Sequence, residues 1–154
     1  MMSMSELKAT PVLANGANLP DALQPDNLPA SLLAAYRGDV SQLPTPEVDY
    51  ELPGGGRVTI FRISGSTIDA GIVTMNGPYP EPGKVARNRG RTELLSALEG
   101  EGIVPVNGQK FPMTTSEAVL VGDNAVYSIE GNGKFLVLVE DSPDGATEII
   151  DPPA

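Results

Sequence analysis

The chain has 154 residues with no histidine and no cysteine, and its 20 acidic residues against 10 Lys and Arg make a formal net charge of −10. The missing imidazole and thiol groups exclude zinc fingers, Ser-His-Asp triads, cysteine nucleophiles, and the usual haem and iron–sulfur sites. The negative charge argues against nucleic acid and membrane surfaces as partners, because both are anionic.

The first 53 residues hold seven of the 15 prolines, and we expect them to form an extended N-terminal arm that crosses the surface of the domain. Within this arm, one short helix is predicted near residues 30–37, because Pro29 precedes a run rich in Ala and Leu that ends at Gly38. We expect the apolar face of this helix to pack on the body of the domain. The first fifteen or so residues are expected to be disordered.

From residue 54 onward, short segments rich in Val, Ile, Thr and Phe alternate with turns rich in Gly, Asn and Asp. Many short strands at close spacing predict one all-β barrel or sandwich over residues 54–141. Asn107-Gly108 and Asn132-Gly133 each predict a two-residue hairpin turn. Residues 142–154 are expected to form a solvated acidic tail. The candidate strands are residues 56–63, 67–75, 92–99, 102–106, 109–113, 117–121, 125–130 and 134–140.

The compartment is predicted from what the sequence lacks. No segment has the apolar length of a signal peptide or of a membrane-spanning helix. The absence of cysteine fits a reducing environment. We therefore expect a cytoplasmic protein that does not associate with membranes.

The segment from Glu93 to Asp141 resembles the cupin superfamily. Residues 93–102 match the end of the first cupin motif, in which a Glu is followed by a Gly, and residues 103–113 resemble the hairpin between the two motifs. Residues 118–124 lie where the second motif belongs, and residues 135–139 resemble the closing strand. The resemblance covers residues 55–141. It implies an all-β, cupin-like double-stranded β-helix, a jelly-roll barrel to which the Pro-rich arm is added.

The sequence departs from cupins at the metal ligands. Members of that superfamily place His-x-His before the motif Glu and a fourth histidine in the second motif, whereas the matching residues here are Arg87-Asn88-Arg89 and Tyr127. A divalent cation between two guanidinium groups would be repelled, and Glu93 alone cannot hold iron or manganese. The resemblance therefore implies the barrel without a metal or another cofactor. It argues against dioxygenase and oxalate-degrading activity.

Four of the ten basic residues lie within eight positions, and we call them the basic cluster. If this segment is extended, Arg87, Arg89 and Arg91 share one face with Glu93, because side chains alternate along a strand. Since Gly90 can interrupt this alternation, the placement of Arg91 on that face is the least well determined. Under the cupin register this face looks into the barrel, where the arginines would form a fork for a carboxylate or phosphate. In the alternative interpretation, the arginines pair with acidic side chains or lie in solvent. The basic cluster comprises Lys84, Arg87, Arg89 and Arg91.

Three functions remain open from the sequence. The first is metal-independent binding of a polar, anionic small molecule, such as an acidic sugar or a carboxylic acid, by the basic cluster. The second is a metal-free isomerase, epimerase, cyclase or lyase that uses Tyr127 and Glu93. Because Arg87 and Arg89 would lower the pKa of Glu93, Tyr127 is expected to be the better general acid. The third is a structural or assembly role as a homodimer, in which the arm reaches a partner chain.

Overall fold

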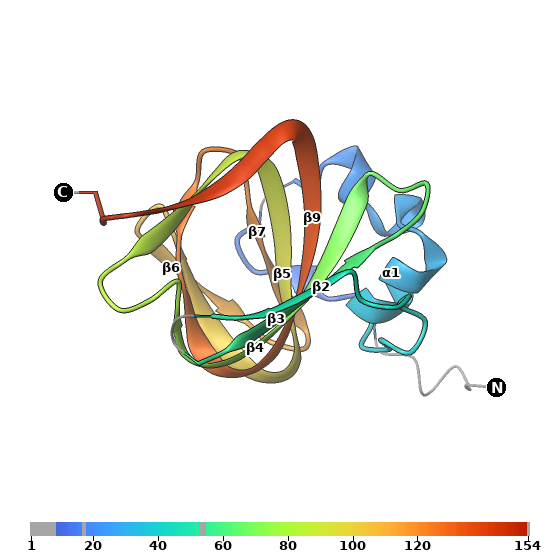
Figure 1. The fold of residues 1–154 in the computed structure, drawn as a ribbon, viewed down its shortest axis with the longest axis horizontal. Helices are drawn as coiled ribbons and strands as arrows, with labels where there is room; N and C mark the ends of the chain where they lie inside the picture. Colours follow the sequence, from blue (N-terminus) through green and yellow to red (C-terminus); the bar gives the residue numbers. More distant parts are fainter. Residues whose placement is uncertain (1–8, 17, 53–54, 154) are drawn as a thin grey trace.

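The computed structural model describes residues 9–16, 18–52 and 55–153, and they form a β-barrel with helices on one side (Figure 1). The short helices of the N-terminal arm gather at the side opposite the C-terminus. In chain order, the elements are β1 (Val12–Leu13), the 3-10 helices η2 (Asp21–Leu23) and η3 (Pro25–Asn27), α1 (Ala30–Tyr36), β2 (Val48–Glu51), β3 (Arg57–Arg62), β4 (Ile68–Tyr79), β5 (Val85–Val106), β6 (Gln109–Met113), β7 (Glu117–Val121), β8 (Val126–Tyr127) and β9 (Ile129–Ile150).

Two long strands organise the barrel. β5 and β9 have 22 residues each and pair antiparallel from Val85 opposite Ile150 to Ile103 opposite Glu130. The strand order is β1-β7-β5-β9-β4-β3-β2, with β6 and β8 also paired to β5. The predicted all-β class is confirmed. The predicted strands 92–99 and 102–106 are parts of β5, and residues 134–140 are the middle of β9.

Glycines let β5 and β9 bend together. Gly100 lies opposite Gly133, and Gly102 lies opposite Gly131. A Cβ atom on Gly131 would come within 2.6 Å of the carbonyl oxygen of Glu101, so a side chain does not fit between the two backbones. The predicted hairpin at Asn132-Gly133 is therefore wrong, because these residues continue β9 and pair with β5. The hairpin at Asn107-Gly108 is confirmed, since both residues have positive φ between β5 and β6.

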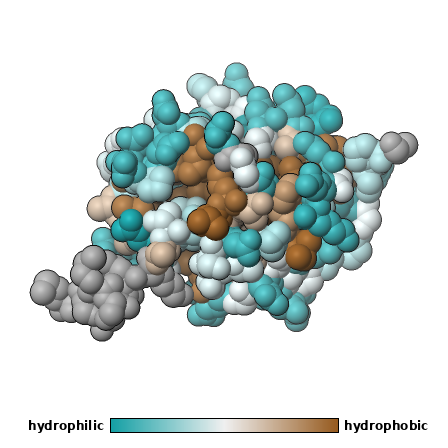
Figure 2. All heavy atoms as spheres, turned by 180° about the vertical axis from the view of Figure 1, so that it is seen from behind, coloured by the Kyte–Doolittle hydropathy of each residue, from teal (hydrophilic) through white to brown (hydrophobic). Residues whose placement is uncertain are grey.

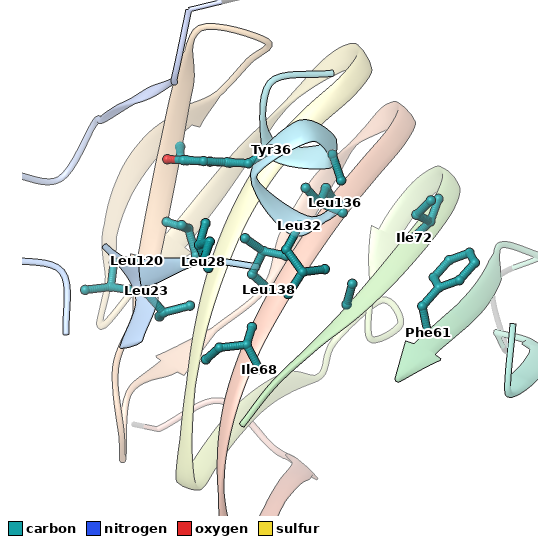
Figure 3. Close-up of a cluster of buried hydrophobic side chains, with 14 residues drawn as sticks. Leu23, Leu28, Leu32, Tyr36, Phe61, Ile68, Ile72, Leu120, Leu136 and Leu138 are labelled. Atoms are coloured by element: carbon teal, nitrogen blue, oxygen red, sulfur yellow. The ribbon is translucent and has the colours of Figure 1, made fainter. Parts of the chain in front are cut away.

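The two faces of the sheet have different partners. Along β9, Leu136 and Leu138 point outward, whereas Phe135, Val137 and Val139 point into the barrel, as the two-residue period requires. The outward leucines pack under α1 (Figure 3). Hydrophobic atoms reach the surface near the middle of the face seen in Figure 2, within a border of hydrophilic side chains.

Helix α1 is confirmed at Ala30–Tyr36, and its C-terminus has local hydrogen bonds that stop it. Gly38 has φ 97° and its N–H donates to the carbonyl oxygen of Ala35 (2.9 Å), while the N–H of Asp39 donates to that of Ala34 (2.8 Å). This pattern is a Schellman motif, which needs a residue with positive φ at the position of Gly38. No helix among the described residues is long and apolar enough to cross a membrane.

The N-terminal arm and the C-terminal segment are more regular than the sequence predicts. β1 pairs parallel with β7, so the expected disorder does not extend to Val12; residues 1–8 lie outside the described residues. The expected solvated tail is wrong for residues 142–150. These residues are the end of β9, and residues 146–150 pair with Val85–Arg89. Backbone pairing and opposite charges on β5 hold this acidic segment in place.

Candidate functional site

The barrel contains a cavity of about 610 Å³. This volume lies within the range of about 300–1,000 Å³ that is typical of small-molecule sites. Apolar side chains of β3, β4 and β9 make up much of the cavity wall. Tyr50 and Ile149, two of the large hydrophobic side chains that are exposed to solvent, also line it. The apolar lining includes Leu52, Val58, Ile60, Val73, Ile129, Val137 and Val139.

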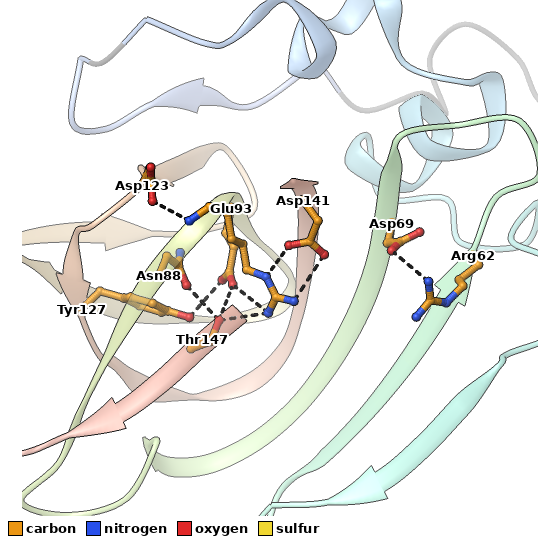
Figure 4. Close-up of polar contacts among 10 residues, drawn as sticks. Arg62, Asp69, Asn88, Glu93, Asp123, Tyr127, Asp141 and Thr147 are labelled. Atoms are coloured by element: carbon orange, nitrogen blue, oxygen red, sulfur yellow. Dashed lines mark hydrogen bonds and ion pairs between the residues drawn. The ribbon is translucent and has the colours of Figure 1, made fainter. Parts of the chain in front are cut away.

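Glu93 and Tyr127 meet at the wall of this cavity. Glu93 is on β5 and only 5% exposed, and Tyr127 is on β8 and 3% exposed. The hydroxyl of Tyr127 donates a hydrogen bond to Oε2 of Glu93 (3.0 Å; Figure 4). The structure thus brings together the two residues that the cupin resemblance placed in one site.

Residues from the end of β9 complete a polar network around Glu93. Nη1 of Arg91 donates to the hydroxyl of Thr147 (2.9 Å), and that hydroxyl donates to Oδ1 of Asn88 (2.9 Å) and lies 3.5 Å from Oε1 of Glu93. Arg91 also binds both carboxylate oxygens of Asp141, at 2.6 and 3.3 Å. Nη1 of Arg91 is 4.0 Å from Oε1 of Glu93. Arg91 is therefore held mainly by Asp141.

Burial determines the acidity of this network. It raises the pKa of Glu93 above its usual value, although the hydrogen bond from Tyr127 and the charge of Arg91 oppose the rise. Burial also raises the pKa of Tyr127 well above 10.0, and the nearby negative charge of Glu93 adds to this effect. Tyr127 therefore keeps its proton at neutral pH. The expectation that arginines lower the pKa of Glu93 is wrong, because burial raises it. The role of Tyr127 as a general acid stays a prediction.

Comparison with known proteins supports the barrel architecture. No protein-family model matches the chain, and no curated protein is similar to it in sequence. Among solved structures, Streptomyces Pac13, a nucleoside dehydratase, matches 68% of this chain and 87% of its own with a TM-score of 0.56 and 12% identity. Variants of Pac13 with uridine match similarly. An RmlC-like cupin from Shewanella frigidimarina matches 67% of this chain and 87% of its own, with a TM-score of 0.51 and 12% identity. The chain has a cupin fold.

Within this cupin fold, most of the basic cluster lies outside the cavity. Nε of Arg89 pairs with Glu148 on the barrel surface (2.8 Å), Lys84 pairs with Asp151, and neither these residues nor Arg87 line the cavity. Only Arg91 of the cluster does so. The expectation that Arg87 and Arg89 look into the barrel is therefore wrong. Their segment of β5 instead pairs with the acidic end of β9.

Gly90 causes this change of faces. The pairing of β5 with β9 is interrupted between Arg89, opposite Ala146, and Arg91, opposite Asp141; Gly90 lies at this interruption, across from residues 142–145, and has φ 64°. Its N–H donates to Oδ1 of Asp123 (2.7 Å). After such a bulge the alternation of side chains is reversed. Asn88 and Arg91 consequently lie on the inner side with Glu93, whereas Arg89 faces solvent.

The residues at the metal positions of cupins do not fit a metal ion here. Arg87 and Arg89 lie outside the cavity, and Tyr127 retains its proton. Glu93 is left as the single carboxylate at those positions, with the guanidinium of Arg91 beside it. The part of the chain that the structure describes holds no group of three or more His, Cys, Asp or Glu side chains suited to a metal.

Several cavity residues were missed by sequence reasoning. Asp141 is the last residue before the predicted tail, and Thr147 lies within that tail. The alternation along Ala146–Ile150, in which Thr147 and Ile149 point inward, is the signal that could have identified a strand there. Tyr79 lies at the end of β4, where its ring centroid is 6.4 Å from that of Tyr127. No sequence pattern marks Gly71 as a cavity residue, because a glycine within a predicted strand has several structural explanations.

Proposed function

We propose that this protein binds a small polar organic molecule inside its barrel without a metal ion, and that Glu93 hydrogen-bonds to that molecule. The observation that carries the proposal is a buried carboxyl group of raised pKa on the wall of a cavity of about 610 Å³. A buried carboxyl group is costly, and such groups are concentrated at functional sites. Apolar side chains of the cavity wall would cover the less polar part of the ligand.

Gly71 supports this proposal independently. It lines the cavity in the middle of β4, where a glycine weakens a strand. Its backbone does not require glycine, because φ is not in the positive region, and a Cβ atom would have its nearest contacts at 3.8 Å and 3.9 Å. The missing side chain therefore serves no local structural need. It leaves space in the cavity for a ligand.

A ligand screen with matched variants tests binding. The full chain is tested by thermal shift against a library of small polar metabolites that includes uridine, hexoses, amino acids and carboxylic acids. We expect stabilisation by at least one compound in the wild type and in Arg89→Ala, whose side chain lies outside the cavity, but not in Gly71→Val, which fills the cavity. Equal stabilisation of Gly71→Val, or no stabilisation of the wild type by any compound, would contradict the proposal.

An acid–base enzyme is the second candidate, and the raised pKa of Glu93 favours it. Such a carboxyl group can take a proton from a bound molecule and return it, as an isomerisation or a dehydration requires. Pac13 is a dehydratase of the same fold. With a substrate found by the screen, Glu93→Gln should lose turnover while it still binds; turnover retained by Glu93→Gln would exclude this candidate. The homodimeric assembly role stays a prediction.

A further inference from the structure

The charge of the cavity wall differs from the charge that the sequence predicts. Four carboxyl groups line the cavity, against two guanidinium groups, those of Arg62 and Arg91. The other members of the basic cluster lie outside it. The wall therefore has more acidic than basic groups, whereas an anion-binding site needs the opposite. The four carboxyl groups are those of Asp69, Glu81, Glu93 and Asp141.

Both guanidinium groups already have acidic partners. Arg91 is bound by Asp141 through two hydrogen bonds. Nε of Arg62 lies 2.8 Å from Glu47 outside the cavity, and its Nη1 is 3.8 Å from Oδ2 of Asp69 (Figure 4). An anionic ligand would have to displace these partners. Among the described residues, the ion pair that Asp69 makes is this long contact with Arg62, and its side chain is 27% exposed.

Asp69 lies where a ligand can reach it. It is an inward residue of β4, two positions before Gly71, so the space that the missing side chain leaves is next to it on the same face. Burial raises the pKa of Asp69, although the positive charge of Arg62 opposes the rise. The nearby carboxylate of Asp141 acts in the same direction.

The aromatic side chains of the cavity also favour a cation. Tyr50, Tyr79 and Tyr127 line it, and the faces of aromatic rings attract ammonium groups. The chain as a whole has a formal net charge of −10, which raises the local concentration of cations.

We propose that the ligand of this cavity is an organic cation, an amine-bearing small molecule whose ammonium group binds Asp69. This inference rests on the proposed function, because it names the chemical class of the ligand for the same cavity. The ammonium would pair with the carboxylate of Asp69, while the uncharged remainder of the molecule contacts the apolar part of the wall and Glu93.

Matched probes separate the two proposals. The full chain is titrated calorimetrically with sets of compounds that share a carbon skeleton, each set containing an amine, its N-acetyl derivative and a carboxylate, as in glucosamine, N-acetylglucosamine and glucuronate, across at least twenty skeletons. We expect at least one amine to bind at least tenfold more tightly than its neutral and anionic counterparts. N-acetyl or carboxylate compounds that bind as well as the amines would overturn the inference but support the proposed function. Failure of every compound to bind would count against both.

Single-residue variants then test whether Asp69 binds the ammonium group. Asp69→Asn should weaken the binding of the selected amine at least tenfold and leave the affinity for its N-acetyl derivative within twofold. Glu101→Gln, an exposed residue outside the cavity, removes the same charge and should change neither affinity. If Asp69→Asn fails to fold, the wild type decides: the amine affinity should fall as salt rises from 50 to 500 mM, while that of the N-acetyl derivative stays constant. An amine affinity that does not respond to either change would contradict the role of Asp69.

Discussion

The hydroxyl of Tyr127 donates a hydrogen bond of 3.0 Å to the carboxyl group of Glu93, from a position 34 residues away in the sequence. Both side chains are buried, so the two groups have little contact with water. The bond favours the ionised form of Glu93, whereas burial favours the protonated form, and burial has the larger effect. The protonation of Glu93 depends on this balance.

Removal of the Tyr127 hydroxyl should destabilise the protein measurably. We expect Tyr127→Phe to lower the free energy of unfolding by about 1.5–3 kcal/mol, because the bond it loses is to a carboxyl group in a buried site. Tyr36→Phe is the matched control: its hydroxyl is also buried but donates to the uncharged carbonyl oxygen of Pro11 (3.2 Å), so its loss should be nearer to 1 kcal/mol. Urea denaturation of the two variants compares them. A loss in Tyr127→Phe that does not exceed that of Tyr36→Phe would contradict this assignment.

The raised pKa of Glu93 has a definite sign in the pH dependence of stability. Between the unfolded value near 4.5 and the higher folded value, the folded state binds more protons than the unfolded state, so stability falls as the pH rises through this interval. Glu93→Gln cannot ionise and should lack this contribution. We therefore expect its free energy of unfolding, relative to the wild type, to increase from pH 4 to pH 8 in urea titrations. A relative stability of Glu93→Gln that falls with pH would contradict the shift.

The Arg91–Asp141 pair should be coupled more strongly than a surface pair. Both side chains are less than one third exposed and share two hydrogen bonds. A double-mutant cycle with Arg91→Met and Asp141→Asn should give a coupling energy of about 1–3 kcal/mol. The same cycle on Arg57 and Asp49, which are 56% and 42% exposed, should give a smaller coupling energy, because solvent screens the pair. Equal coupling in the two cycles would show that the cavity does not strengthen the pair.

Gly71 should be replaceable without loss of stability. Gly71→Ala fits without a close contact and removes conformational freedom from the unfolded chain, so we expect it to stabilise the protein by about 0.4–1 kcal/mol in thermal or urea unfolding. Gly131→Ala is the contrasting variant, because its Cβ would collide with the carbonyl oxygen of Glu101, and it should destabilise. Destabilisation by Gly71→Ala of the same size as by Gly131→Ala would mean that Gly71 is required for folding rather than for an open cavity.

The sequence predicts the helix, most strand positions and the convergence of Glu93 with Tyr127, because these depend on local patterns or on the cupin resemblance. It does not predict which residues lie on the inner face near Arg91. Gly90 interrupts the alternation of β5, so the residues before it lie on the opposite face from the one that strict alternation from Glu93 predicts. The hydrogen bond between Tyr127 and Glu93 also cannot be derived from a local pattern, because it joins residues of β8 and β5 that are 34 positions apart in the chain.

The end of β9 was missed for another physical reason. An acidic segment with Pro143 and Gly145 has little tendency to form a strand alone, and composition therefore predicts a solvated tail. Its strand forms because the basic residues of β5 lie opposite it, as in the pair of Arg89 with Glu148. The basic cluster is thus explained largely by the acidic segment, a relationship that neither segment reveals when it is considered alone.

The long pairing of β5 with β9 also sets the time at which the barrel can form during synthesis. β9 is the last of the described strands to leave the ribosome, and it links β5 to β4. Until β9 is made, β4 and β5 lack the strand that pairs with both of them. The outward leucines of β9 are also not yet available to pack against α1. We expect this barrel to remain open until β9 emerges, and then to close in one step that depends on contacts distant in sequence.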